Sequence, residues 1–466
     1  MLFNSYEFLF LFFPLVLVGT YICRKAGAVY RNIFWLIASL FFYAWLSPVY
    51  LPVMIGSMAV NYGLFWQMER TARKKQVLLI GLLIHLGALA CFKYVGDGSF
   101  VPLGISFFTF TQIAFLVECY RENIKGVSAL NYGLYVSFFP KMMQGPIALP
   151  GDFLPQLERV GQKVDWEQIY RNLYLFVLGL FKKVLIADTF GKAVDFGYGN
   201  LAALNSGDAL IVMLSYTLQL YFDFSGYCDM AMGVAGMLGI ELPLNFDSPY
   251  KASNIVDFWK RWHRTLTGFF TRYLYIPLGG NRKGKARTYL NCLVVFFLSG
   301  IWHGAGWQFI VWGMMHGVLY VLTKAFLDNK GVGKRSVIGV CLTFLYVNVA
   351  WIFFRAPSVR EALNLLKTIV SASFGRINWE LAGCFNLDEF WYVIKVLHLD
   401  RWQCAHYILM VIILIAVLLL VFFGKNAVEF TKTVKPGVIH TVIMAVLFMW
   451  SVISFSGVSS FLYVNF

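Results

Sequence analysis

The stretch FLSGIWHGAGWQFIVWGMMHG, from Phe297 to Gly317, places an ionisable side chain inside an apolar segment that is long enough to enter a lipid bilayer. His303 stands there between Trp302 and Gly304. An imidazole in hydrocarbon is costly unless protein surrounds it, so such a residue is either packed for structure or retained for chemistry. Because buried histidines are mostly structural, other parts of the chain have to decide between these interpretations.

The composition predicts a polytopic membrane protein, because 59% of the 466 residues are hydrophobic and only 14% are charged. Apolar runs that span a bilayer, or nearly do, predict ten or eleven transmembrane helices. We therefore expect an all-α fold, with residues 1–466 forming a single membrane-embedded domain. The runs lie at roughly 7–23, 31–47, 49–67, 76–92, 170–188, 207–222, 288–325 (two segments), 337–354, 405–423 and 437–455.

The formal net charge of +15 does not predict nucleic-acid binding here, because the basic residues lie mostly in loops between apolar runs. The positive-inside rule explains such loops as cytoplasmic. The basic residues around Arg24 and around Arg73 make the first two such loops cytoplasmic, which places the N-terminus outside. The same rule makes Lys425, Lys432 and Lys435 cytoplasmic, so the C-terminus and the loop 372–404 are expected to be external.

The largest polar insertion, residues 247–287, carries nine basic and two acidic residues and is expected to be cytoplasmic. From Asn254 to Tyr273 its apolar residues recur with a helical period, and Asn254 is suited to cap the start of that helix. Such a basic amphipathic helix commonly just lies at the membrane interface, and we give this interpretation the same weight as a role in the chemistry. His263, however, borders the apolar stripe of the helix.

Several other features bear on chemistry. Gly300, Gly304 and Gly306 around His303 favour a close helix approach or a break in the helix. The stretch YFDFSGYCDM (221–230) contains Asp223 and Asp229, which must line a cavity or pair internally; a carboxylate there could orient a histidine, or the cluster could simply be a polar helix end. The eight scattered cysteines form no metal-binding pattern, so no metal site is expected.

Five collinear stretches resemble the membrane-bound O-acyltransferases, and within them the branch of alginate-type and peptidoglycan-type O-acetyltransferase membrane subunits. The series RWH, YIPLGGNR and WHG is the most specific part of the resemblance. The stretches are PLGISFFTFTQIAFLVECYR (102–121), FFPKMMQGPI (138–147), YFDFSGYCDMAMG (221–233), NFDSPYKASNIVDFWKRWHRTLTGFFTRYLYIPLGGNR (245–282) and LSGIWHGAGWQFIVWGMMHG (298–317).

The resemblance implies that His303 is the general base for an acceptor hydroxyl and that His263 is an accessory group near a thioester. Histidine suits this chemistry because its ordinary pKa lies near neutrality. Asp223, Asp229 and Trp302 are candidates for a supporting network. The implied donor is acetyl-CoA, with no bound cofactor, and its phosphates are expected to contact basic residues of the insertion, for which the candidates are Lys260, Arg261, Arg264 and Arg282.

The resemblance further implies a multi-pass protein of the bacterial cytoplasmic membrane that acetylates an extracytoplasmic polysaccharide such as alginate. Transfer would be direct or through an extracytoplasmic acetyltransferase partner of the SGNH type. Two funnels meeting at His303 would pass the acetyl group without moving the whole carrier. The C-terminal FLYVNF (461–466) resembles an aromatic tail in which a tyrosine relays the acyl group, which makes Tyr463 a candidate relay; an interfacial aromatic anchor is the plain alternative.

Three rival functions remain open at this point. The D-alanyl transferase of teichoic acid modification shares FW-x-RWH but is less similar over YIPLGGNR, so acetyl is favoured over D-alanyl. A transporter or flippase with a His/Asp relay would move substrate without consuming acetyl-CoA, and inverted repeats would favour it. A scaffold for a polysaccharide export machine would not need His303 for acetylation.

Overall fold

The structure, a computed structural model, describes residues 1–95, 101–159, 165–330, 336–371, 373–387, 389, 395, 396, 398, 402, 404–457, 461 and 462. Within these residues all regular structure is helical. Each apolar run predicted from the sequence coincides with a helix, so the all-α polytopic fold class is confirmed. Tyr463 and much of the predicted external loop 372–404 lie outside the described residues.

Seven helices of the described chain are long and apolar enough to cross a membrane, and two shorter ones are also apolar. The seven are η1 with α1 (Phe8–Ala26), α2 (Ala28–Leu46), α3 with the turn before it (Pro48–Arg70), α4 (Lys74–Tyr94), α14 (Trp307–Lys330), α15 (Val337–Arg355) and α19 (Ala405–Phe423). The shorter two are α5 (Ile105–Tyr120) and α21 (Val438–Ile453).

The other helices are short or carry more polar residues. They are α6 (Ala129–Ser137), α7 (Pro150–Arg159), α8 (Trp166–Phe181) with η3 (Lys182–Ala187), α9 (Asp188–Gly199), α10 (Ser206–Met237), α11 (Ile255–Arg261), α12 (Arg264–Phe270) with η6 (Thr271–Tyr275), α13 (Lys285–His303), α16 (Val359–Ser371), α17 (Trp379–Gly383) and α20 (Ala427–Thr433). Single turns occur at η2 (Pro48–Tyr50), η4 (Leu201–Ala203), η5 (Pro249–Lys251) and η9 (Ser454–Gly457).

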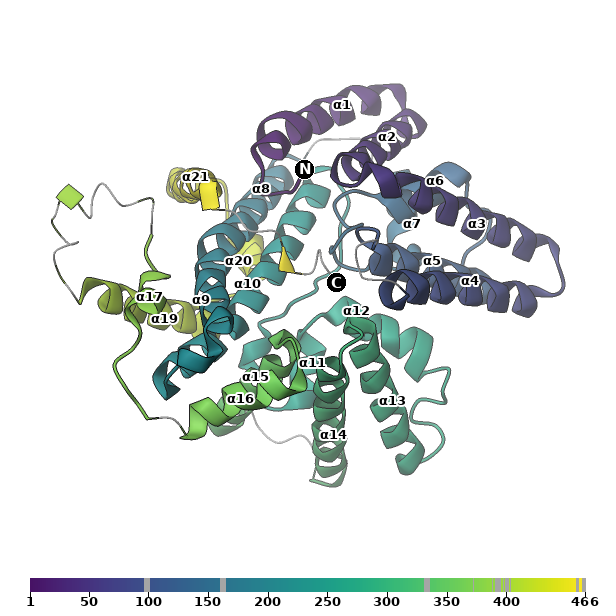
Figure 1. The fold of residues 1–466 in the computed structure, drawn as a ribbon. Coiled ribbons are helices and arrows are strands. Elements are labelled where there is room, and N and C mark those ends of the chain that lie inside the picture. Colours follow the sequence, from purple (N-terminus) through teal and green to yellow (C-terminus); the bar gives the residue numbers. More distant parts are fainter. Residues whose placement is uncertain are drawn as a thin grey trace.

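Helix α10 is the central element of the fold. It packs against α8, α9, η3, α15 and α16, and nearly all of its residues from Val212 onward are buried. Figure 1 shows α8 and α10 between the N-terminal helices α1 to α7 on one side and α17 to α21 on the other, with α11 to α16 forming a third group. Because α10 contacts members of several groups, its side chains lie where those groups meet.

The apolar runs of the sequence leave out α5, because Ser106, Thr109, Thr111 and Gln112 dilute its hydropathy. All four are nevertheless buried. Two of them bond within the protein: Thr111 Oγ1 donates to the carbonyl oxygen of Phe107 at 2.8 Å, and Gln112 Nε2 donates to Ser57 Oγ at 2.9 Å. Hydropathy therefore underestimates how deeply a helix is buried when its polar side chains have hydrogen-bond partners in the interior.

Glycines allow α8 and α10 to pack with their backbones close together. A Cβ at Gly179 would lie 2.6 Å from the carbonyl oxygen of Gly226, and a Cβ at Gly226 would lie 2.8 Å from that of Gly179. Beside this contact two lysines pair with carboxylates of α10: the half-buried Lys182 with Asp229 at 2.5 Å and the buried Lys183 with Asp223 at 2.8 Å. Lys183 also contacts Asp188 at 2.8 Å.

The last described residues of the chain are anchored to α10. Phe461 is fully buried and packs edge-on against Tyr227, with ring centroids 5.0 Å apart. The backbone nitrogen of Leu462 donates to Asp223 Oδ2 at 3.1 Å. The C-terminal segment therefore enters the interior as far as Leu462 and does not stop at the end of α21.

Much of the segment 247–287 is folded into the interior, which differs from the polar insertion that its charge predicts. Trp262, His263, Leu266 and Phe269 are buried, whereas the residues from Asn281 to Arg287 are exposed. Of the predicted external loop 372–404, the described part includes α17, in which Leu381 and Ala382 are buried.

Helices α13 and α14 form a hairpin with a glycine-lined contact. A Cβ at Gly300 would lie 2.5 Å from the carbonyl oxygen of Phe309, and a Cβ at Gly313 would lie 2.5 Å from that of Phe296. Small residues let helix backbones approach closely in membranes. The predicted close approach at Gly300 is confirmed, and the predicted break occurs at Gly304, where α13 ends.

We expect Gly300→Ala to lower the apparent melting temperature of the detergent-solubilised protein, because the added methyl group meets backbone that cannot move aside; overpacking of this kind costs about 1–3 kcal/mol. Gly87→Ala is the matched control, since Gly87 also lies in a helix and has no atom within 4 Å of an added Cβ. A Gly300→Ala protein as stable as Gly87→Ala would contradict the close approach.

Candidate active site

His303 is the last residue of α13, at the turn of the α13–α14 hairpin. The end of α4 binds two of the last carbonyl groups of α13. Lys93 Nζ donates to the carbonyl oxygen of Trp302 at 2.6 Å, and the Tyr94 hydroxyl donates to that of Ile301. A cation beside the unpaired carbonyls at a helix C-terminus is favourable. The end of α4 therefore fixes the end of α13 and, with it, the position of His303.

Aromatic rings enclose the imidazole of His303, which is 5% exposed. Its ring centroid lies 4.5 Å from Trp302, 5.0 Å from Trp312 and 4.9 Å from Phe354. These residues come from α13, α14 and α15. A buried site with aromatic walls is the kind of environment in which a positioned base is most effective.

His263 lies at a break in the helix that the sequence predicts to be continuous from Asn254 to Tyr273. Asn254 caps the start, as predicted, through a hydrogen bond from Asp257 N. The helix α11 then ends at Arg261, and α12 begins at Arg264. Between them His263 has φ 44° and ψ 51°, a left-handed conformation that is unusual for a residue with a side chain. The prediction of one continuous helix is wrong.

The buried partner of His263 is Asn245, not a carboxylate. His263 Nδ1 lies 3.0 Å from Asn245 Oδ1, and the His263 ring packs edge-on against Phe224 at 4.8 Å between centroids. The suggested role of Asp223 or Asp229 in orienting a histidine finds no support, because both carboxylates face Lys183 and Lys182. The sequence does not indicate these lysine partners, since both lysines lie inside an apolar run.

The structure brings His303 and His263 into the same aromatic interior. Rings connect them in steps of 5 to 6 Å: Trp312 contacts His303 and Trp351, Trp351 contacts Trp262, and Trp262 contacts Phe246 beside His263. Residues forty positions apart in the sequence thus share one site.

A cavity of about 290 Å³ leads toward this site between α11, α12, α13 and α14. Its walls are mainly apolar, and Lys260 and Lys324 are the charged residues that line it. Ser299 also lines the cavity and is one helical turn before His303, on the same face of α13. The rise of an α-helix makes this separation about 6 Å along the axis. The cavity therefore extends nearly to the histidine.

The predicted donor-binding residues do not all face this cavity. Lys260 lines it. Arg261 is paired with Asp257 at 2.9 Å, and Arg264 lies 3.6 Å from Asp247, so both arginines brace the break around His263. Arg282 is exposed in the turn before α13.

Sequence reasoning missed several residues of the site. His316 lies in the same aromatic cluster, with its ring centroid 5.2 Å from Trp312. Its Nδ1 is 3.4 Å from Trp259 Nε1, and Trp259 lines the cavity. The spacing of four residues between Trp312 and His316 on one helix is the signal that places both on one face. Lys93, Lys324 and Asn245 carry no comparable local signal.

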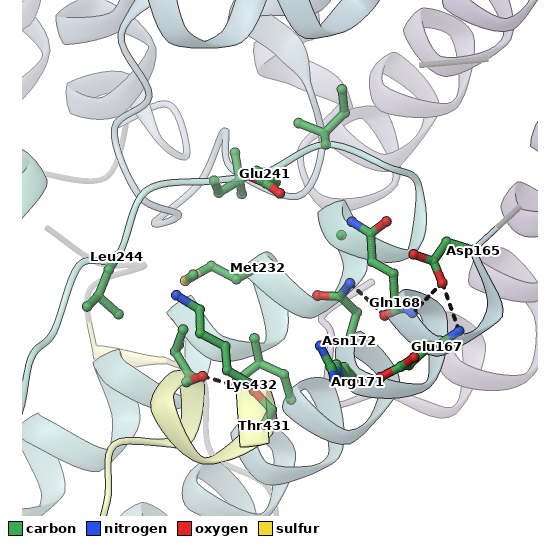
Figure 2. Close-up of a pocket in the computed structure, with 15 residues that line it drawn as sticks. Asp165, Glu167, Gln168, Arg171, Asn172, Met232, Glu241, Leu244, Thr431 and Lys432 are labelled. Carbon is green, nitrogen blue, oxygen red and sulfur yellow. Dashed lines mark hydrogen bonds and ion pairs between the residues drawn. The ribbon is translucent and has the colours of Figure 1, made fainter. Parts of the chain in front are cut away.

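A larger cavity of about 560 Å³ lies between the start of α8, the end of α10 and α20. Figure 2 shows Lys432 reaching from α20 towards Met232, and Asp165 bonded to the first turn of α8. The charged residues that line this cavity are of both signs, and no histidine lines it. Because no histidine lines this cavity, the smaller cavity beside α13 is the better candidate for the reaction site.

No cluster of three or more His, Cys, Asp or Glu side chains suited to a metal occurs within the part of the chain that the structure describes. The described cysteines are all free. Cys119, Cys228 and Cys292 are buried, whereas Cys91, Cys341 and Cys404 are exposed.

Comparisons with known proteins agree with this arrangement. A profile of the membrane-bound O-acyltransferase family matches residues 34–356, which include both histidines. The chain is 38% identical over 420 residues to a peptidoglycan O-acetyltransferase of Helicobacter pylori, covering 79% of this chain and 80% of the relative. It is 35% identical over 407 residues to the probable alginate O-acetylase AlgI of Pseudomonas aeruginosa, covering 82% and 76%.

A teichoic acid D-alanyltransferase of Bacillus subtilis is more distant, with 30% identity over 272 residues, which cover 54% of this chain and 68% of the relative. The matches to the O-acetyltransferases extend further along the chain. The aromatic site with two histidines, the family profile over more than half of the residues and the long alignments agree, and the chain therefore belongs to the membrane-bound O-acyltransferase family as a membrane O-acetyltransferase.

Proposed function

We propose that this protein takes an acetyl group from cytoplasmic acetyl-CoA and passes it across the membrane to a hydroxyl group of an extracytoplasmic polysaccharide. The relatives named as peptidoglycan and alginate acetylating enzymes support the polysaccharide as acceptor. The observation that carries the proposal is the cavity that begins beside Lys260 and Lys324 and ends one helical turn from His303.

In the proposed reaction His303 is the general base. The acceptor oxygen forms a bond to the acetyl carbonyl carbon while its proton passes to the imidazole. The carbon–sulfur bond then breaks, and the thiolate of coenzyme A leaves. A neutral imidazole suits this step because it accepts a proton near neutral pH.

His263 acts as an accessory group near the thioester. It immediately precedes α12, and Leu266, Thr267 and Phe270 of that helix line the cavity. Phe270 also lies against Trp302, with ring centroids 6.4 Å apart. The wall that would hold the thioester end of the donor is thus continuous with both histidines.

The membrane orientation is proposed from loop charges and is supported by the packing of two helices. The end of α4 contacts the end of α13, so the basic residues that precede α4 and those that precede α13 lie at the opposite ends of these helices. We place those basic ends in the cytoplasm, as the positive-inside rule expects. This puts both chain termini outside a bacterial cytoplasmic membrane.

On the external side we propose that the acetyl group passes either directly to the polysaccharide or through an extracytoplasmic acetyltransferase of the SGNH type. Tyr463 would carry the acetyl group on its phenolic oxygen as a covalent intermediate. The residue before it, Leu462, donates its backbone N–H to Asp223 Oδ2 at 3.1 Å.

Radiolabelled acetyl-CoA supplied to inside-out vesicles tests the proposal. We expect label to appear on a polysaccharide or on the protein itself, with release of free coenzyme A. A D-alanyl transferase would leave acetyl-CoA unused, as would a transporter or flippase. Polysaccharide transport with no consumption of acetyl-CoA would therefore refute the proposal.

His303→Ala should lower acetyl transfer by about 10²–10⁴-fold, because the general base is lost. His440→Ala is the matched control, since His440 lies against the aromatic rings of Tyr174 and Phe430 at the other end of the chain. Transfer rates are compared at equal amounts of folded protein in vesicles. Acetylation at the wild-type rate in His303→Ala would remove this residue from the mechanism.

Lys260→Glu should raise the KM for acetyl-CoA by about tenfold, equivalent to ~1.4 kcal/mol, and change kcat less, because a cation that holds donor phosphates contributes to binding. Lys283→Glu is the control, since Lys283 is exposed and does not line the cavity. Equal effects of the two charge reversals would indicate that only the general charge of this face matters.

Tyr463→Phe separates the two interpretations of the tail, because phenylalanine keeps the aromatic ring and removes the nucleophilic oxygen. A relay predicts loss of polysaccharide acetylation at normal membrane levels of the protein. An interfacial anchor predicts full acetylation. Mass spectrometry of the C-terminal peptide for an acetylated tyrosine provides an independent measurement.

A further inference from the structure

We propose that Asn245 is a positioning residue that sets the tautomer and the orientation of His263. This inference rests on the proposed role of His263 as an accessory group. Asn245 lies in the loop between α10 and α11 and is fully buried. Its side chain and backbone together bond to His263 in the break between α11 and α12 and to the first residues of α12.

The amide oxygen of Asn245 faces a set of donors from that break. Oδ1 lies 3.0 Å from His263 Nδ1, 2.9 Å from Thr265 Oγ1 and 3.3 Å from Thr265 N. On the other side Asn245 Nδ2 donates to Cys228 Sγ of α10 at 3.2 Å. Because Thr265 N can only donate, the atom of the Asn245 amide that faces it must be the oxygen. The same oxygen therefore also faces His263.

This assignment fixes the histidine tautomer. A carbonyl-type oxygen only accepts hydrogen bonds, so His263 Nδ1 must carry the proton that it shares with Asn245. In neutral His263 the lone pair is then on Nε2. This atom is buried and has no hydrogen-bond partner among the described residues. Asn245 thus presents the basic nitrogen of the ring to the interior.

Asn245 also stabilises the backbone that carries the ring. The left-handed conformation of His263 separates α11 from α12 and leaves the first amides of α12 without partners in the helix. The carbonyl oxygen of Asn245 accepts from Arg264 N at 2.9 Å, and its side chain accepts from Thr265 N. Asn245, from the loop before α11, therefore caps the start of α12 in place of the His263 side chain.

A second contact connects this centre to the buried segment between α6 and α7. Ile147 N donates to Thr265 Oγ1 at 3.1 Å, and Thr265 Oγ1 donates to Asn245. On the other side, Leu244, the residue before Asn245, lines the large cavity shown in Figure 2. Asn245 therefore holds His263 against several parts of the fold at once.

The first test measures the tautomer directly and does not depend on enzyme activity. Solid-state NMR of the ¹⁵N-histidine-labelled full chain in lipid gives the signals of His263 by difference from His263→Gln. We expect a neutral ring with a protonated Nδ1 and an unprotonated Nε2. The opposite tautomer in the wild-type protein would overturn the proposal, whether or not the proposed reaction occurs.

The second test measures acetyl transfer in vesicles. Asn245→Ala should lower kcat by about 100-fold, as expected when a reacting group is displaced, with the KM for acetyl-CoA changed less than threefold. Asn245→Asp keeps the accepting oxygen and should restore at least a tenth of the wild-type rate. Cys228→Ala is the control: it removes the contact on the other side of Asn245 and should leave the rate unchanged.

A double mutant distinguishes positioning from general support of the fold. If Asn245 acts through His263, Asn245→Ala combined with His263→Ala should be no slower than His263→Ala alone. Effects that multiply would overturn the proposal. Absence of acetyl transfer in the wild-type protein would count against the proposed function only, because the NMR test of Asn245 stands apart from it.

Discussion

A peptide group that leaves helical geometry in the apolar interior of this protein needs a hydrogen bond from within the protein, because hydrocarbon offers none. The rest of the structure depends on how this need is met. Asn245 bonds the break between α11 and α12, and Lys93 with Tyr94 bonds the end of α13. Ser39 and Thr265 bond the buried segment between α6 and α7. Each break is held by a side chain from another segment.

The same breaks place the chemistry. A histidine within an unbroken helix would face either lipid or a neighbouring helix. At the end of α13 and between α11 and α12, the chain instead turns, and both imidazoles enter one interior lined by Trp312, Trp351 and Trp262. Aromatic walls keep that interior dry, which strengthens electrostatic interactions with a reacting group. A functional site in this interior therefore depends on the two helix breaks, because only there does the chain turn both imidazoles inward.

Much of the fold is predictable from the sequence, because spanning helices are encoded locally by runs of apolar residues. Helix α5 is not, because its polar residues lower the hydropathy and Gln112 among them is satisfied by distant partners such as Ser57. The break at His263 escapes prediction for the same reason: the pattern from Asn254 to Tyr273 is helical, and Asn245 imposes the break from outside it. Likewise the lysine partners of Asp223 and Asp229 depend on how α8 packs against α10.

The geometry also explains how an acetyl group could cross without its carrier. The cavity wall on α13 runs from Cys292 to Ser299, about 10 Å at the rise of an α-helix, and His303 is about 6 Å further on. The hydrocarbon core of a bilayer is about 30 Å thick. A donor whose charged phosphates stay beside Lys260 and Lys324 therefore has to extend only its uncharged thioester end along α13. In the proposed reaction the costly step, moving the charged carrier through hydrocarbon, is avoided because the hairpin brings His303 to the end of the cavity.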